Sequence, residues 1–285
     1  MDRIIKSLTP TALLVAGAVV FVLGAGFLLG SDATLASNTP GASGDLGQAG
    51  RWLQFVAWVC LLGGVCTAGW EVVVRSEWAA AAEIAAAALG TLLFTVGQAA
   101  YAASDGSSPA AAVTGAVGIG VWALLVLSRA ARVSLAEQGP AYGTAQAELN
   151  AVLGVGVRRR QADLWLAAAV GLFLLAIGYG ITSAGGSEGP GIAAGVLEAA
   201  GAATLAGSVA AARSRQLLDS RPVPSVLIGL VLLAISFLAY AIVSGLDFST
   251  LTALGLSFAI IIAIELAGIV ALGLAAWTRV RELYR

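Results

Sequence analysis

Eight long apolar segments alternate with short polar connections along the chain. Each segment is about 19 to 28 residues long, which is enough for a helix to span a hydrocarbon core of about 30 Å. The pattern therefore predicts an all-α, polytopic membrane protein with about eight transmembrane helices. The segments are Pro10–Gly30, Trp52–Val74, Ala79–Ala102, Ala110–Ser128, Leu164–Ala184, Gly191–Ala212, Val223–Ser244 and Leu251–Thr278.

Basic residues gather on one side of this predicted membrane protein. If the first segment runs from inside to outside, 14 of the 15 basic residues fall in inner connections and only Arg51 falls outside. Cytoplasmic loops carry such an excess of Lys and Arg. The distribution places both termini in the cytoplasm of a multi-pass protein of the cell membrane. The inner residues are Arg3, Lys6, Arg75, Arg129, Arg132, Arg158, Arg159, Arg160, Arg213, Arg215, Arg221, Arg279, Arg281 and Arg285.

The first segment also fits a cleaved signal peptide, because Arg3 and Lys6 precede an apolar run that ends near Ala36. Signal peptides have an apolar core of about 7–15 residues, and this run is about 20 residues long. Its length favours a retained membrane anchor.

Two of the even-numbered segments share a pattern that indicates internal repeats. Glu198–Leu205 and Glu265–Leu272 both read E-x-A-G-x-x-x-L, and each is followed by R-x-R. The odd-numbered segments resemble one another near their outer ends, where Tyr101, Tyr179 and Tyr240 begin similar stretches. We therefore expect four helical hairpins in tandem, each of which enters and leaves on the cytoplasmic side.

The longest inner connection divides the chain into two halves. Residues 1–132 form an N-terminal four-helix membrane half, 133–163 a cytoplasmic connecting loop, and 164–285 a C-terminal four-helix membrane half. Within the loop, Thr144–Val157 has apolar residues at helical spacing, which suggests a short helix on the inner leaflet. Arg158, Arg159 and Arg160 follow it and fit either a lipid or partner contact or an ordinary positive-inside anchor; the second reading is favoured.

The inventory of reactive side chains excludes most chemistry. The chain has no His, one Met, two Cys and a single lysine, Lys6, outside the apolar segments. These residues provide no zinc cluster, haem ligands, Ser-His pair or retinal lysine. No phosphate-binding glycine loop occurs in a suitable context, and a net charge of −1 gives no sign of a nucleic-acid partner. We expect no enzyme, no metal site and no cofactor.

Carboxylates remain as the polar groups inside the predicted membrane. Glu198 and Glu265 lie 15 and 14 residues before Arg213 and Arg279, or about 21–22 Å from them along a helix. Glu83 and Glu71 lie nearer the inner ends and are expected to reach the surface. No basic residue of any predicted span provides a counter-ion for the two deeper carboxylates. They therefore either bind protons or cations in turn or hold helices together as neutral hydrogen-bond donors.

These observations leave several functions open. The leading one is a carrier or channel for protons, cations or a small solute, with Glu198 and Glu265 as the intramembrane polar site. The alternative is a non-catalytic accessory or scaffold subunit of a larger membrane complex, with other membrane subunits or a second copy of the chain as partners. A membrane sensor is less favoured, because no cytoplasmic output domain follows Thr278.

Overall fold

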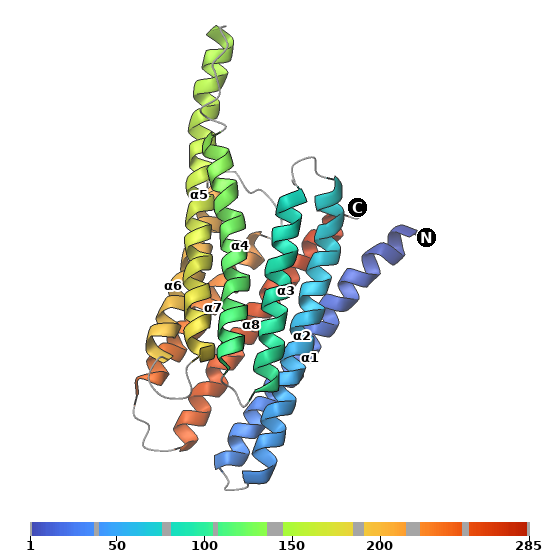
Figure 1. The fold of residues 1–285 in the computed structure, drawn as a ribbon, viewed down its shortest axis with the longest axis vertical. Coiled ribbons are helices and arrows are strands. Elements are labelled where there is room, and N and C mark those ends of the chain that lie inside the picture. The colour runs from blue at the N-terminus through green and yellow to red at the C-terminus, as the bar shows by residue number, and fades with distance from the viewer. Residues whose placement is uncertain are drawn as a thin grey trace.

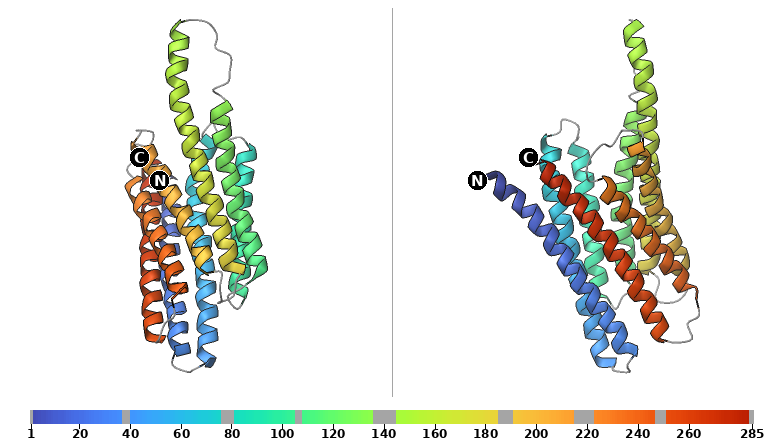
Figure 2. Two further views of the ribbon diagram at one scale, coloured as in Figure 1. Left: turned by 90° about the vertical axis from the view of Figure 1, so that its left-hand side faces the viewer. Right: turned by 180° about the vertical axis from the view of Figure 1, so that it is seen from behind.

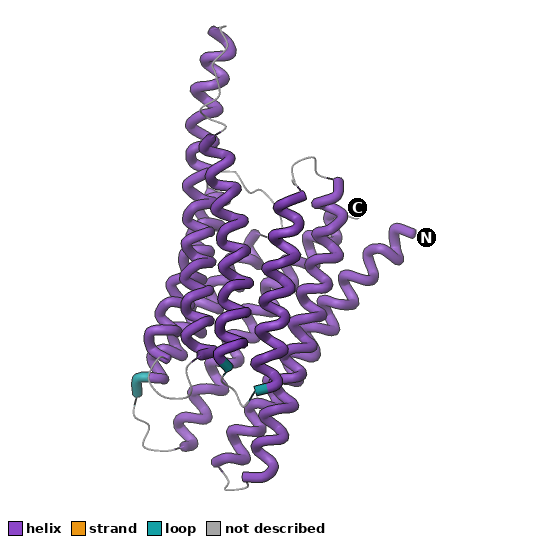
Figure 3. The backbone as a smooth tube through the Cα atoms, viewed as in Figure 1, coloured by secondary structure: helices purple, strands orange, loops and turns teal. Residues whose placement is uncertain are grey.

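The computed structural model describes residues 2–36, 40–75, 81–104, 108–135, 145–184, 191–214, 223–246 and 251–283. Within these ranges the chain forms eight α-helices, as the sequence predicts (Figure 3). They are α1 (Asp2–Ala36), α2 (Pro40–Arg75), α3 (Ala81–Ala103), α4 (Pro109–Leu135), α5 (Ala145–Ala184), α6 (Gly191–Ser214), α7 (Val223–Ser244) and α8 (Leu251–Leu283).

The helices form a bundle in which each one packs against the next in the sequence, and α8 packs back against α1. The circuit of neighbouring helices is therefore closed. In Figure 1, α2 to α5 face the viewer, and α7 and α8 lie behind them. The start of α1 and the end of α8 lie at one end of the bundle, here called the termini end (Figure 2). At the opposite end, here called the turn end, α1, α3, α5 and α7 end and α2, α4, α6 and α8 begin (Figures 1 and 2).

Consecutive helices pack together throughout the bundle, both within and between the expected hairpins. For example, α4 packs against α5 as well as against α3. This packing does not single out the hairpin as a unit, so the tandem repeat stays a prediction.

Small residues fill the interior, and large aliphatic residues cover the outside. Ala57, Ala102 and Ala194 are fully buried, whereas Leu92 and Val113 are 60% and 62% exposed. A protein in water has the reverse tendency, because its large apolar side chains are the ones that leave the solvent. In lipid, apolar tails solvate the outer side chains, and small residues allow close van der Waals packing between helices. The distribution is compatible with a bundle surrounded by hydrocarbon.

Glycines mark the closest approaches between neighbouring helices. A Cβ atom added to Gly97 of α3 would lie 2.6 Å from the backbone nitrogen of Gly115 on α4. At the α5–α6 contact, a Cβ added to Gly171 would lie 2.9 Å from the carbonyl oxygen of Gly201. Any side chain at these positions would push the backbones apart, so the contacts depend on glycine.

Larger side chains gather in one cluster, between α2, α3, α4 and α5. Phe94 of α3 lies at its centre, and its ring is 5.6 Å from Trp58, 5.7 Å from Trp122 and 5.8 Å from Tyr179. Rings at these distances interact favourably beyond simple contact. The cluster therefore links four consecutive helices and fixes the position of Tyr179.

Five helices contain a described stretch that is long and apolar enough to cross a membrane. Between 17% and 44% of the residues in these stretches are buried inside the protein, and the others are partly or fully exposed. The apolar helices indicate a membrane location. The stretches are Ala85–Ala103, Pro109–Ala131, Gln161–Ala184, Gly191–Ser214 and Val223–Ser244, and the shorter apolar stretches Ala12–Leu28 and Ile260–Ala275 lie in α1 and α8. The full number of eight crossings stays a prediction.

Several helices extend well beyond the apolar segments that predicted them. The helix α5 runs without a break over 40 residues, so residues 145–157 continue it instead of forming the separate helix expected there. In Figure 1 this part of α5 projects past the other helices at the termini end. The helix α2 begins at Pro40, which places Arg51 within a helix and not in an outer connection. Hydropathy marks the lipid-facing part of a helix, whereas backbone hydrogen bonding continues into polar flanks.

Candidate functional site

Glu198 is a buried carboxylate of the C-terminal half. It lies on α6, seven residues after the helix begins at Gly191, and its side chain is 8% exposed. The Thr182 hydroxyl of α5 donates a hydrogen bond to Glu198 Oε1, with the oxygens 3.2 Å apart. This hydroxyl is the only hydrogen-bond partner of the Glu198 carboxylate among the described residues. The carboxylate predicted from sequence is therefore buried at a helix contact with a neutral partner.

The α5–α6 contact leaves room for this carboxylate because residue 178 is glycine. A Cβ atom on Gly178 would lie 2.5 Å from Glu198 Cγ and 3.0 Å from the carbonyl oxygen of Ala194. The glycine thus allows the Glu198 side chain to lie flat against the backbone of α5. In this position the side chain extends along α5 to Thr182, one turn further on.

One face of α5 carries polar groups close to its end at Ala184. Tyr179, Thr182 and Ser183 are spaced i, i+3 and i+4, which brings them to one side of a helix. The Gln98 amide of α3 donates a hydrogen bond of 2.9 Å to the Tyr179 hydroxyl, and Ser183 lies beside that hydroxyl. These contacts join α3, α5 and α6 through polar side chains near the turn end.

Tyrosines from three odd-numbered helices come together near this site. Tyr101 of α3 is close enough to Tyr179 of α5 and to Tyr240 of α7 for electrostatic interaction. Arg51 of α2 is within the same reach of Tyr101. The three tyrosines are those whose flanking sequences resemble one another. Tyr179 and Tyr240 are therefore both within electrostatic reach of Tyr101, as Arg51 is.

Glu265 lies on α8, 14 residues after Leu251 and 14 before Arg279, at mid-length of the helix segment between them. Its side chain is half-buried and makes no hydrogen bond or ion pair with the described residues. It is nevertheless close enough to Glu198 for the two carboxylates to interact electrostatically. One turn before Glu265, the Ser236 hydroxyl of α7 donates to the Ile261 carbonyl at 3.4 Å. The structure therefore brings the two predicted glutamates within electrostatic reach of each other from different helices.

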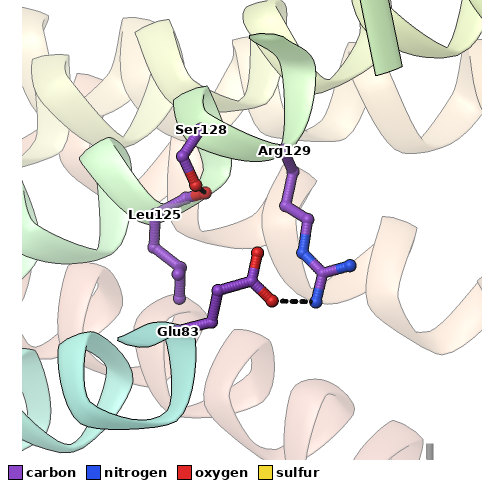
Figure 4. A network of polar contacts seen from close by, with 4 residues as sticks. All are labelled: Glu83, Leu125, Ser128 and Arg129. Carbon is purple, nitrogen blue, oxygen red and sulfur yellow. Dashed lines mark hydrogen bonds and ion pairs between the residues drawn. The ribbon is translucent and has the colours of Figure 1, made fainter. Parts of the chain in front are cut away.

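Glu83 corrects an expectation from the sequence, which placed it at the surface. Its side chain is only 6% exposed, and Arg129 Nη2 of α4 donates to its Oε2 at 2.5 Å (Figure 4). The two residues lie opposite each other because α3 begins where α4 ends. A carboxylate in the first turn of a helix also interacts favourably with the helix dipole. Glu83 is thus paired with a cation, whereas no such pair forms at Glu198 or Glu265 within the part of the chain that the structure describes.

The structure does not describe the side chains of the remaining candidates from the sequence. The backbone of Arg158, Arg159 and Arg160 belongs to α5, but their side chains lie outside the described residues, as does that of Glu71. Sequence reasoning did not single out Thr182, which contacts Glu198. The spacing of Tyr179, Thr182 and Ser183 was the available signal, because three polar residues on one face of an apolar helix face its neighbours more readily than lipid.

No protein-family model, curated protein or solved structure matches the chain.

Proposed function

We propose that the chain is a carrier or channel of the cell membrane for protons or small cations, and that Glu198 and Glu265 form its binding site. In this proposal all eight helices cross the bilayer as four hairpins, with the termini end in the cytoplasm and the turn end outside. The asymmetry of the basic residues supports this orientation. The protein binds and moves its ligand without catalysing a reaction.

The observation that carries the proposal is the environment of Glu198. A carboxylate inside the membrane costs on the order of 3 kcal/mol on insertion scales when it is charged. Here the carboxylate has a neutral hydroxyl as its partner, and a second carboxylate lies within electrostatic reach. Two nearby carboxylates without a cation are stabilised by binding a proton or a positive ion. Glu83 does not need a bound proton or positive ion, because Arg129 already neutralises its carboxylate.

The test is ion flux through the full chain in proteoliposomes. We expect Glu198→Gln and Glu265→Gln each to reduce flux at least tenfold, because each amide keeps the size of the side chain and loses its titratable charge. Asp163→Asn is the matched control, since it removes an exposed carboxylate of α5. Folding is checked by helical circular dichroism. Wild-type flux in both glutamine variants would refute the proposal.

A second candidate function is that of an accessory or scaffold subunit, and one feature of the polar side chains favours it. Several hydroxyls in the spans donate to carbonyls of their own helix, so they have no proton free to donate to a ligand. They include Thr91, Thr95, Thr114, Thr204 and Ser208. Under this alternative Glu198 joins helices, the chain co-purifies with partner subunits, and Glu198→Gln changes assembly instead of flux.

A further inference from the structure

We infer that the ion bound at Glu198 is a proton, that it arrives from the turn end of the bundle, and that Thr182 is the residue that positions it. This inference rests on the proposed function and specifies its ligand, its direction of access and one additional residue. It depends on three features: the few oxygen atoms around Glu198, the depth of the carboxylate, and the packing on either side of it.

The surroundings of Glu198 provide too few ligands for a bare metal cation. Hard cations such as Mg²⁺ and Ca²⁺ require six or more oxygen ligands. Among the described residues, the hydrogen-bonded group at Glu198 consists of its two carboxylate oxygens and the Thr182 hydroxyl, and the Glu265 carboxylate makes no hydrogen bond with this group. The nearby carbonyl of Ala194 lies within the backbone ladder of α6, one turn before Glu198. A proton needs only one carboxylate oxygen and one hydrogen-bond acceptor, and this site has both.

The groups around Glu198 from the neighbouring helices contain no described cation. From α5, the neutral side chains of Tyr179 and Thr182 approach it. From α7, the backbone of Phe237 and the methyl group of Ala241 pack against α6 at Gly195, one turn before Glu198. From α8, Glu265 brings a second acidic group within electrostatic reach. Protonation of either carboxylate therefore removes a repulsion that no neighbouring cation cancels.

The depth of Glu198 makes the turn end the shorter route. Glu198 lies seven residues, or about 10 Å, from the start of α6, whereas Arg213 near the other end of the helix is about 22 Å away. Its partner Thr182 lies two residues before the end of α5. Glu265 lies 14 residues after the start of α8, at mid-length of that helix. The turn end is therefore the shorter route to Glu198.

The packing between α5 and α6 differs on the two sides of Glu198. Toward the turn end, Thr182 presents its hydroxyl to Glu198. Toward the termini end, a Cβ atom on Gly201 would lie 2.8 Å from Leu175 Cγ, and one on Gly171 would lie 3.0 Å from Leu205 Cγ. Apart from these leucines, the contact holds the carbonyl oxygens of Gly171 and Gly201, which the α-helical backbone already uses as hydrogen-bond acceptors. The contact is therefore polar on the turn-end side and closed by apolar groups on the other.

Thr182 holds the carboxylate in both of its states. When Glu198 is ionised, the Thr182 hydroxyl donates to it, as the structure shows. When Glu198 takes a proton from water at the turn end, the new carboxyl O–H donates and the Thr182 oxygen accepts. The water is left as hydroxide or is re-protonated from bulk, and no bond between heavy atoms changes. Thr182 is therefore a positioning residue.

The first test measures proton and Na⁺ uptake by the full chain in liposomes with a clamped membrane potential. We expect proton flux without Na⁺ flux, a loss on the order of tenfold in Thr182→Val, and near wild-type flux in Thr182→Ser, which keeps the hydroxyl. Thr204→Val is the control, because Thr204 donates to Ala200 of its own helix. Na⁺ flux that is independent of the proton gradient would overturn the inference and leave the carrier function standing. Absence of any flux in the wild type would overturn both.

The second test determines the side of access. Thr182→Cys is made in a chain with Cys60→Ala and Cys66→Ala, and a membrane-impermeant thiol reagent is applied to intact cells and to inverted vesicles. We expect labelling in intact cells only, and no labelling of Thr204→Cys in either preparation. Labelling of residue 182 only in inverted vesicles would overturn the direction of access. Unchanged flux in Thr182→Val would overturn the role of the hydroxyl.

Discussion

Replacement of Gly178 by alanine tests the α5–α6 contact on which the site depends. The added Cβ atom would lie 2.5 Å from Glu198 Cγ, 3.0 Å from the Ala194 carbonyl oxygen and 3.1 Å from the Glu198 backbone nitrogen. Optimal contact between carbon atoms is about 3.5–4.0 Å, so the methyl group is about 1 Å too close to the Glu198 side chain. Two of the three atoms belong to the backbone of α6 and cannot rotate away.

The chain has two ways to relieve this overlap, and both are costly. If α5 and α6 move apart, the contact is overpacked, which costs about 1–3 kcal/mol. If the Glu198 side chain rotates instead, it loses the 3.2 Å hydrogen bond from Thr182, which contributes about 1 kcal/mol. We therefore expect Gly178→Ala to lower the free energy of unfolding by about 2 kcal/mol.

The matched control is Gly207→Ala on α6. An added Cβ atom at Gly207 meets no other atom within 4 Å, so the substitution introduces no overlap. Alanine also favours a helix over glycine by about 1 kcal/mol, at least in water. The control should be as stable as the wild type or slightly more stable. Both variants have the same change in composition and differ only in their surroundings.

The assay is reversible unfolding in mixed detergent micelles with increasing dodecyl sulfate, followed by helical circular dichroism. Gly178→Ala should unfold at a clearly lower fraction of denaturing detergent than Gly207→Ala. Equal midpoints for the two variants would show that α5 and α6 are not in contact at residue 178. In that case Glu198 would not lie against α5, and the description of the site would be refuted.

Two further predictions concern the N-terminal half. Arg129→Met should destabilise the protein by about 2 kcal/mol, because it leaves the Glu83 carboxylate, 6% exposed, without its cation; the 35% exposure of the Arg129 side chain moderates the loss. In a double-mutant cycle, adding Glu83→Gln to Arg129→Met should recover part of this loss of stability. Strictly additive effects of the two substitutions on the free energy of unfolding would contradict a direct pair. Phe94→Ala should lower the free energy of unfolding by about 3 kcal/mol in the same assay, mainly because it leaves a cavity between Trp58, Trp122 and Tyr179. The lost apolar burial contributes less than it would in water, because lipid also solvates an exposed ring. Leu92→Ala is the control, because Leu92 is 60% exposed on the outside of the same helix, and an equal effect there would argue against the aromatic cluster.

The pattern of apolar residues was sufficient to predict eight helices and their order. A helix that faces lipid must form its backbone hydrogen bonds internally and present apolar side chains. A continuous run of apolar residues is therefore enough to predict it. The residues at which the helices begin and end were harder to predict from the sequence. Arg51 seemed to lie in a connection because the apolar run begins at Trp52, yet α2 begins at Pro40.

The sequence also identified Glu198 and Glu265 as candidates, because a carboxylate within an apolar run is visible without knowledge of its neighbours. The contrast between Glu83 and Glu198 required the tertiary structure. Both lie on apolar helices, but Arg129 pairs with Glu83 across the α3–α4 contact, whereas Thr182 meets Glu198 across the α5–α6 contact.

Hydropathy is a property of each residue, and its pattern was enough to predict which parts of this chain form helices. The partner of a buried polar group depends on which faces of two helices meet. In this bundle, glycines such as Gly178 set that contact, through backbone distances that no local pattern specifies. For that reason the tertiary structure alone decided which carboxylate is neutralised and which remains beside a neutral hydroxyl.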